Sequence, residues 1–95
     1  MINKPLVSII LPTYNRAHLL PRAVDSVLAQ TFPNWELIIW NDGSTDETAK
    51  VLSTYLDPRI RVFSAPNQGK STALNQALAR ARSEEHTSEL QSRQS

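Results

Sequence analysis

The chain has 95 residues, a formal net charge of +1 and 40% hydrophobic residues. This length accommodates at most one small domain, and so small a charge argues against a nucleic-acid-binding protein or one held to membranes by charge. Cysteine is absent, which excludes disulfides and thiolate metal sites and favours a reducing, cytoplasmic location.

The first predicted element is a strand over residues 7–11, a nearly continuous apolar run that Pro12 is expected to end. This run is too short to span a bilayer and lacks a signal-peptide cleavage pattern. An amphipathic helix is predicted next, because apolar residues recur at spacings of three and four over residues 19–28. Asn15 is a candidate cap for this helix, and Pro21 fits only in its first turn.

The same alternation continues through the rest of the chain. Residues 36–40 predict a second buried strand, and Ser44 and Glu47 match an S-x-x-E capping box, which predicts the start of a helix. Residues 60–63 alternate in the manner of an edge strand, and residues 73–81 predict a third helix. The expected buried side of the second helix consists of Val51, Leu52, Tyr55 and Leu56.

The order strand, helix, strand, helix, strand, helix predicts an α/β fold with an open, parallel, Rossmann-like sheet and right-handed crossovers. Such sheets bind ligands beyond the carboxyl ends of their strands. Pro12 and Tyr14 follow the first strand, and Asp42 follows the second. If these strands are neighbours, the three residues face one ligand site.

Each of these residues also has a purely structural explanation. Asp42 can cap the turn that begins at Gly43, or it can accept hydrogen bonds from a ligand. Tyr14 can pack in the core, or it can offer a flat face on which a base stacks. Pro12 fixes the local backbone and can form part of a pocket wall.

The sequence Gly69-Lys70-Ser71-Thr72 resembles the end of a phosphate loop. The first glycine of that motif is replaced by Ser64, and Pro66 interrupts the loop, so a phosphate-loop nucleotidase is the less favoured hypothesis. Lys70, near a predicted helix N-terminus, is placed either to meet a diphosphate or to remain a solvated lysine. No His, Asp and Glu cluster has the spacing of a metal site.

The stretch over residues 82–95 differs from the rest of the chain, since it holds a single large apolar residue, Leu90. Such a composition predicts a disordered tail. Its sequence RSEEHTSELQS resembles the in-frame translation of a common short-read sequencing adapter. We therefore expect residues 82–95 to be a non-native tail and residues 1–81 to be the N-terminal part of a domain.

The motifs PTYNR, DGSTD and NQGKSTALN together resemble the start of family 2 glycosyltransferases, inverting enzymes with the GT-A fold. The resemblance implies that Pro12 and Tyr14 line the pocket for the nucleotide base, with Tyr14 against the base. It implies that Asp42 accepts a hydrogen bond from the base, commonly uracil, and that Lys70 lies toward the diphosphate. The family usually has an acidic residue where this chain has Asn41.

The resemblance also implies partners and a cofactor. The donor would be a nucleotide sugar, with a UDP-sugar favoured, and the acceptor a saccharide, a lipid-linked sugar or another glycoconjugate. The family's metal-binding Asp-x-Asp and catalytic base follow the third helix and have no counterpart here. We therefore expect Mg²⁺ or Mn²⁺ in a full-length parent but not on these residues.

The same comparison leads us to expect a domain truncated after its third strand–helix unit. Such a chain would be catalytically inactive and would expose the edge of its first strand. Any membrane attachment is expected through the missing C-terminal part. The alternative is a non-catalytic nucleotide-binding module.

Overall fold

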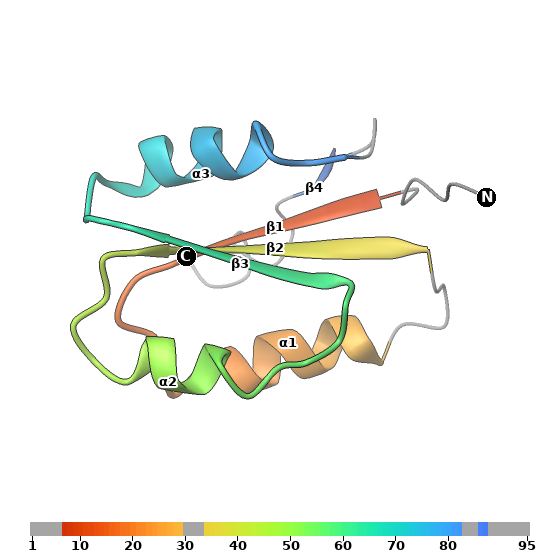
Figure 1. Cartoon of the computed structure of the whole chain (residues 1–95), viewed down its shortest axis with the longest axis horizontal. Coiled ribbons are helices and arrows are strands. Elements are labelled where there is room, and N and C mark those ends of the chain that lie inside the picture. Colours follow the sequence, from red (N-terminus) through yellow and green to blue (C-terminus); the bar gives the residue numbers. More distant parts are fainter. Residues whose placement is uncertain (1–6, 30–33, 83–85, 88–95) are drawn as a thin grey trace.

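The computed structural model describes residues 7–29, 34–82 and 86–87. Within them a parallel sheet in the order β3-β2-β1-β4 carries helices on both faces (Figure 1). The predicted open α/β fold is therefore confirmed. The strands are β1 Val7–Thr13, β2 Trp35–Asp42, β3 Ile60–Ala65 and β4 His86–Thr87, and the helices are α1 Leu20–Leu28, α2 Thr48–Leu52 and α3 Lys70–Leu78.

The two central strands separate two apolar clusters. Alternate residues of a strand point to opposite faces, so Ile9 and Leu11 pack with α1 and α2, whereas Ile10 and Ile38 pack with α3. Every residue of β2 is buried. This explains why the sequences of β1 and β2 are almost continuously apolar.

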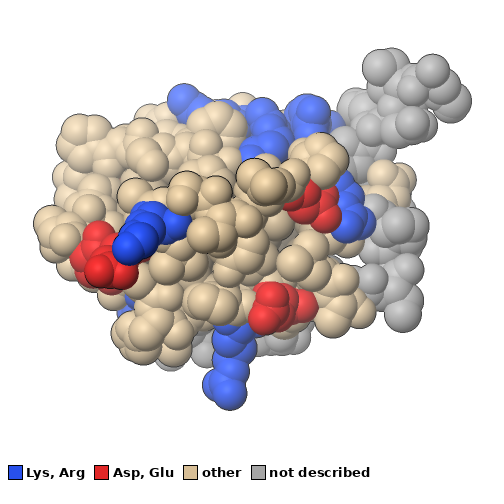
Figure 2. All heavy atoms as spheres, turned by 60° about the horizontal axis from the view of Figure 1, so that its bottom comes forward, with Lys and Arg blue, Asp and Glu red and all other residues tan. Residues whose placement is uncertain are grey.

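Helix α1 presents one apolar side to the sheet, made of Leu20, Ala23, Val24 and Val27. Pro21 lies in its first turn, as predicted, but the predicted cap is wrong, because the N-cap residue is Leu19 and no side chain caps the helix. Figure 2 looks toward the face of the molecule that carries α1 and α2, where charged side chains of both signs are interspersed with uncharged ones. None of the described helices is long and apolar enough to cross a bilayer.

Strand β1 continues through Pro12 to Thr13, so the prediction that the proline ends this strand is wrong. The pairing described between β1 and β4 covers only Ser8 and Ile9. Around Pro12, the only described pairing of β1 is therefore with β2. Proline has no backbone N–H, and a strand tolerates that loss best where one of its sides is unpaired.

Helix α2 begins later than the capping box predicted, and the box does not form. Asp46 instead accepts hydrogen bonds from the backbone N–H and the hydroxyl of Thr48. The hydroxyl bond, together with backbone N–H donors, lowers the pKa of Asp46 below its usual 3.8. Because α2 ends at Leu52, Leu56 lies beyond it and is 88% exposed, contrary to the prediction that it is buried.

The predictions for the two edges of the sheet are only partly correct. Strand β3 lies at one edge and has the alternating burial predicted for it. At the other side β4 pairs in parallel with Ser8 and Ile9, so the expectation of an open β1 edge is wrong at these positions. Most of the predicted tail over residues 82–95 lies outside the described residues. Where it is described, Arg82 bonds to Glu36 and residues 86–87 form β4, so the prediction of a disordered tail is wrong at these positions.

Glu36 ties several elements together near the start of β2. This carboxylate is 1% exposed and accepts hydrogen bonds from the Ser8 hydroxyl, from Arg61 Nη1 at 3.0 Å, and from the backbone N–H and Nε of Arg82 at 2.7 and 3.0 Å. Burial raises the pKa of Glu36, but the bonds from Arg82, Ser8 and Arg61 outweigh burial, so the pKa lies below 4.5. Glu36 therefore anchors the chain just after α3.

Candidate functional site

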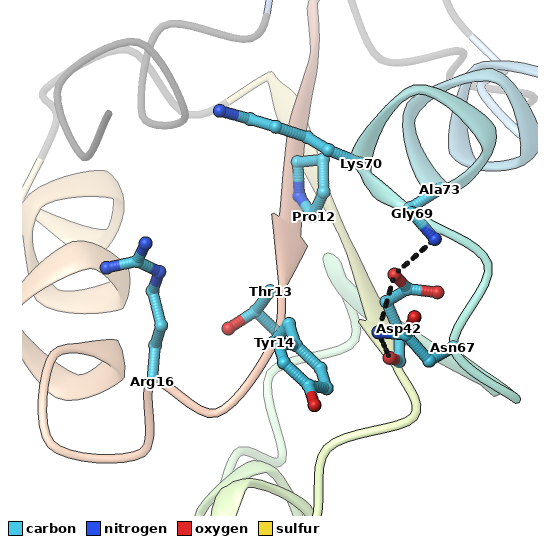
Figure 3. Close-up of a pocket in the computed structure, with 9 residues that line it drawn as sticks. All are labelled: Pro12, Thr13, Tyr14, Arg16, Asp42, Asn67, Gly69, Lys70 and Ala73. Atoms are coloured by element: carbon cyan, nitrogen blue, oxygen red, sulfur yellow. Dashed lines mark hydrogen bonds between the residues drawn. The ribbon is translucent and has the colours of Figure 1, made fainter.

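A pocket of about 240 Å³ lies where β1 and β2 end, beside the N-terminus of α3 (Figure 3). The residues predicted to form the site, Pro12, Tyr14, Asp42 and Lys70, all line this pocket. Their convergence follows from the topology, because β1 and β2 are parallel neighbours whose carboxyl ends share one edge of the sheet. Five further lining residues were not predicted: Thr13, Arg16, Asn67, Gly69 and Ala73.

Asp42 is the acidic residue of this pocket, and its carboxylate is 4% exposed. Its Oδ1 accepts the backbone N–H of Gln68 at 2.9 Å, and its Oδ2 accepts the backbone N–H of Gly69 at 3.1 Å. The amide of Asn67 donates to the Asp42 carbonyl at 3.1 Å and, at 3.4 Å, to Oδ2. Asp42 thus ties the end of β2 to the loop that leads into α3.

The turn after β2 is stabilised by a different residue. The side-chain oxygen of Asn41 accepts the backbone N–H of Ser44 at 3.1 Å. Asp42 therefore does not have the turn-capping role that was its local structural explanation. Gly43 has a φ of +73°, and an added Cβ would overlap the backbone nitrogen of Asn67.

The loop before α3 lacks the arrangement of a phosphate loop. A phosphate loop directs its backbone N–H groups at the phosphate oxygens. Here the N–H groups of Gln68 and Gly69 point to the carboxylate of Asp42. The anion at the N-terminus of α3 is therefore the Asp42 carboxylate, which argues against the phosphate-loop hypothesis. In this segment the Lys70 side chain remains suited to contact a diphosphate.

Tyr14 lies in the loop directly after β1 and is 45% exposed. This exposure excludes core packing as the explanation for the aromatic ring and leaves a face for a ligand. Beside it, the buried hydroxyl of Thr13 has no hydrogen-bond partner among the described residues. A buried hydroxyl without a partner is uncommon and is typical of a group that a ligand or a water completes.

The charges around the pocket are arranged unevenly. Arg16 and Lys70 line it as cations, against the single anion Asp42. Neither cation forms an ion pair with a described residue. In Figure 3 their charged ends lie toward the left of the view, whereas Asp42 lies at the right. The pocket therefore has an acidic hydrogen-bonding end and a cationic end.

A divalent metal does not fit the described donors. Within residues 7–29, 34–82 and 86–87 no three His, Cys, Asp or Glu residues gather in a way that could hold a metal ion. The pocket offers one carboxylate, Asp42, whose oxygens already accept N–H groups, whereas Mg²⁺ requires several free oxygen ligands. No metal-dependent step is assigned to these residues.

The chain is similar to known proteins in sequence and in structure. Residues 8–85 match the family model described as glycosyl transferase family 2. The chondroitin synthase of Pasteurella multocida strain Pm70 is 46% identical over 80 residues, which cover 82% of this chain and 8% of that protein. The chain thus spans less than a tenth of this relative.

Two solved structures resemble the fold. The crystal structure of S. aureus TarS 1-349 matches with a TM-score of 0.76 and 30% identity, covering 82% of this chain and 25% of that one. The mannosyltransferase PcManGT from Pyrobaculum calidifontis, solved in complex with GDP-Man and Mn²⁺, matches with a TM-score of 0.67 and 31% identity over the same shares. The chain therefore has the sheet-and-helix arrangement of GT-A glycosyltransferases.

Proposed function

The chain belongs to glycosyl transferase family 2, and on that basis we propose that its pocket binds the nucleotide of a nucleotide-sugar donor. The donor we favour is a UDP-sugar, and the acceptor a saccharide or lipid-linked sugar. The observation that carries this proposal is the shared pocket of Tyr14, Asp42 and Lys70 at the ends of β1 and β2. An aromatic face, a hydrogen-bond acceptor and a cation match the base and the diphosphate of one ligand.

The base is assigned to the end of the pocket that holds Tyr14 and Asp42. A half-exposed tyrosine ring can stack on a base, a contact worth about 1–3 kcal/mol. A carboxylate has about four acceptor positions. The bonds from Gln68 at 2.9 Å, Gly69 at 3.1 Å and Asn67 at 3.4 Å occupy three of them, which leaves one for a further N–H. Uracil and guanine both present such an N–H, and the similar mannosyltransferase PcManGT was solved with GDP-Man.

The diphosphate is assigned to the end that holds Lys70 and Arg16. When a glycosyl group leaves a nucleotide sugar, negative charge grows on the diphosphate, and nearby cations stabilise it. The pocket volume of about 240 Å³ is below the roughly 300–1,000 Å³ of complete small-molecule sites. This size suits part of a nucleotide sugar better than the whole molecule.

The remaining chemistry is assigned to no residue of this chain. Inverting transfer needs a base that deprotonates the acceptor hydroxyl, and in a longer protein Mg²⁺ or Mn²⁺ would neutralise the leaving diphosphate. We propose that residues 1–81 form the donor-binding part of such a protein and that residues 82–95 are a non-native tail. The 95-residue chain is then expected to bind UDP without turnover, in the cytoplasm.

The test is calorimetric titration of the chain with UDP, GDP, uridine and ATP at low salt. We expect UDP to bind, and Lys70→Ala to weaken UDP about five- to tenfold while leaving uridine unchanged, because uridine lacks the diphosphate. Lys50→Ala on α2 is the matched control, since it removes an exposed lysine that does not line the pocket.

Asp42→Ala should abolish binding of both UDP and uridine, with Asp25→Ala on α1 as control. Thermal unfolding must accompany this variant, because Asp42 also holds the loop before α3. Binding of neither UDP nor GDP would contradict the proposal. ATP binding that depends on Lys70 but not on Asp42 would favour the nucleotidase, and UDP binding without glycosyl transfer by a longer natural protein would favour the non-catalytic module.

A further inference from the structure

Asn15 has an unusual backbone conformation at the edge of the pocket. Its φ of 52° is the one positive value outside glycine among the described residues. Asparagine tolerates this left-handed conformation better than most residues. Its two neighbours, Tyr14 and Arg16, line the pocket, whereas Asn15 does not. The conformation therefore turns the Asn15 side chain away from the space where a ligand would lie.

The Asn15 side chain instead holds the loop after β2. Its Oδ1 accepts the backbone N–H of Thr45 at 2.7 Å and that of Asp46 at 3.2 Å. Its own backbone N–H donates to Ser44 Oγ at 2.9 Å. The loop after β2 also accepts a bond from the loop after β1, because Asp46 Oδ2 accepts the backbone N–H of Ala17 at 3.2 Å. Hydrogen bonds in both directions thus join two loops that are about thirty residues apart in sequence.

These hydrogen bonds between the two loops begin just beyond the last paired residues of β1 and β2. The ladder between β1 and β2 ends at the pair Thr13 and Asn41. Beyond it, Asp42 is still held by its pairing with Ala65 in β3, whereas Tyr14 lies outside the pairing of β1. The ladder restrains Tyr14 through Thr13 on one side, and the bonds of Asn15 restrain it on the other.

We propose that Asn15 is a positioning residue for the nucleotide pocket, which fixes Tyr14 opposite Asp42 before the ligand arrives. The inference rests on the proposed function for the identity of the ligand. Holding a loop in its binding conformation removes an ordering cost from association. Loss of Asn15 should therefore weaken nucleotide binding although Asn15 does not touch the nucleotide.

The test compares Asn15→Gly with Asn15→Asp in the 95-residue chain. Glycine keeps the positive φ at no steric cost but removes the acceptor, whereas aspartate keeps an acceptor oxygen and tolerates the same φ. Two nuclear magnetic resonance readouts are used: hydrogen exchange of the Thr45 and Asp46 amides, and the order parameter of the Tyr14 amide. UDP affinity is measured on the same samples.

In Asn15→Gly we expect the Thr45 and Asp46 amides to exchange about tenfold faster. The Tyr14 order parameter should fall from about 0.85 toward 0.6, and UDP affinity should fall about five- to tenfold. Asn15→Asp should restore most of each value. If Asn15→Gly unfolds the chain, Ser44→Ala removes only the bond from the Asn15 N–H and should give the same changes in smaller measure.

Two results would overturn the inference. The first is an unchanged Tyr14 order parameter in folded Asn15→Gly, and the second is unchanged UDP affinity despite faster exchange of Thr45 and Asp46. Failure of the wild-type chain to bind either UDP or GDP would instead refute the proposed function. In that case the Tyr14 order parameter alone decides whether Asn15 positions the loop, since that measurement needs no ligand.

Discussion

Replacing Glu36 by glutamine should destabilise the fold without touching the pocket. The carboxylate is 1% exposed and accepts bonds from Ser8, Arg61 and Arg82. Glutamine has only one acceptor oxygen. Its amide NH₂ group would stand where Glu36 has its second carboxylate oxygen, and would there meet donor groups of these partners. The change also removes the charge that two arginines neutralise.

The expected loss in the free energy of unfolding depends on how exposed the two arginine partners of Glu36 are. Breaking a fully buried ion pair costs about 3–5 kcal/mol. The side chains of Arg61 and Arg82 are 27% and 55% exposed, so both can turn partly to water, and we expect about 2–3 kcal/mol. Because the pKa of folded Glu36 lies below 4.5, its stabilisation is complete above the unfolded pKa and is lost as the pH falls through the folded pKa.

The assay is urea unfolding of the wild type and Glu36→Gln at pH 7 and at several values below pH 4.5. The difference in the free energy of unfolding should be largest at pH 7 and should shrink as the pH falls. Glu47→Gln is the control, because Glu47 is exposed and its side chain does not cap α2. A difference below about 0.5 kcal/mol at pH 7, or one that does not change with pH, would refute this account of the Glu36 bonds.

Three further substitutions test the packing by thermal or urea unfolding. Gly43→Ala should cost about 2–4 kcal/mol, because φ is +73° and the new Cβ meets the Asn67 backbone; a neutral result would show that the turn can rearrange. Ile38→Ala, at a fully buried site against α3, should cost about 2–5 kcal/mol, and a loss below about 1 kcal/mol would contradict close packing there. Leu56→Ser should change stability by less than about 0.5 kcal/mol, since Leu56 is 88% exposed; a larger loss would place that side chain in contact with the fold.

The sequence was sufficient for the fold because its two central strands, β1 and β2, are buried on both faces. Continuous apolar runs identified β1 and β2, and their alternation with amphipathic segments predicted the parallel sheet. That topology alone brought Tyr14 and Asp42 to one edge. Whether the pocket residues have the roles implied by the family resemblance stays a prediction.

Interactions between distant segments could not be predicted in the same way. Asn15 and Ser44 both looked like helix caps, because a local pattern cannot reveal a partner some thirty residues away, and the structure bonds them to each other's loops. Leu56 continued an apolar spacing beyond the point where α2 ends. Thr13 and Arg16 stand in the PTYNR motif, but no contact with a ligand was assigned to them, and the folded sheet brings them to the pocket.

The two acidic residues of β2 also fix the length of the segment that lies between their partners in this 95-residue chain. Asp42 holds Gly69 before α3, and Glu36 holds Arg82 after it. Six strand residues span about 20 Å, and the nine residues of α3 span about 14 Å, so the helix and its short turns just bridge the two carboxylates. One inserted residue would rotate the helix by about 100° and break one tether. Insertions between residues 69 and 82 should therefore not be tolerated.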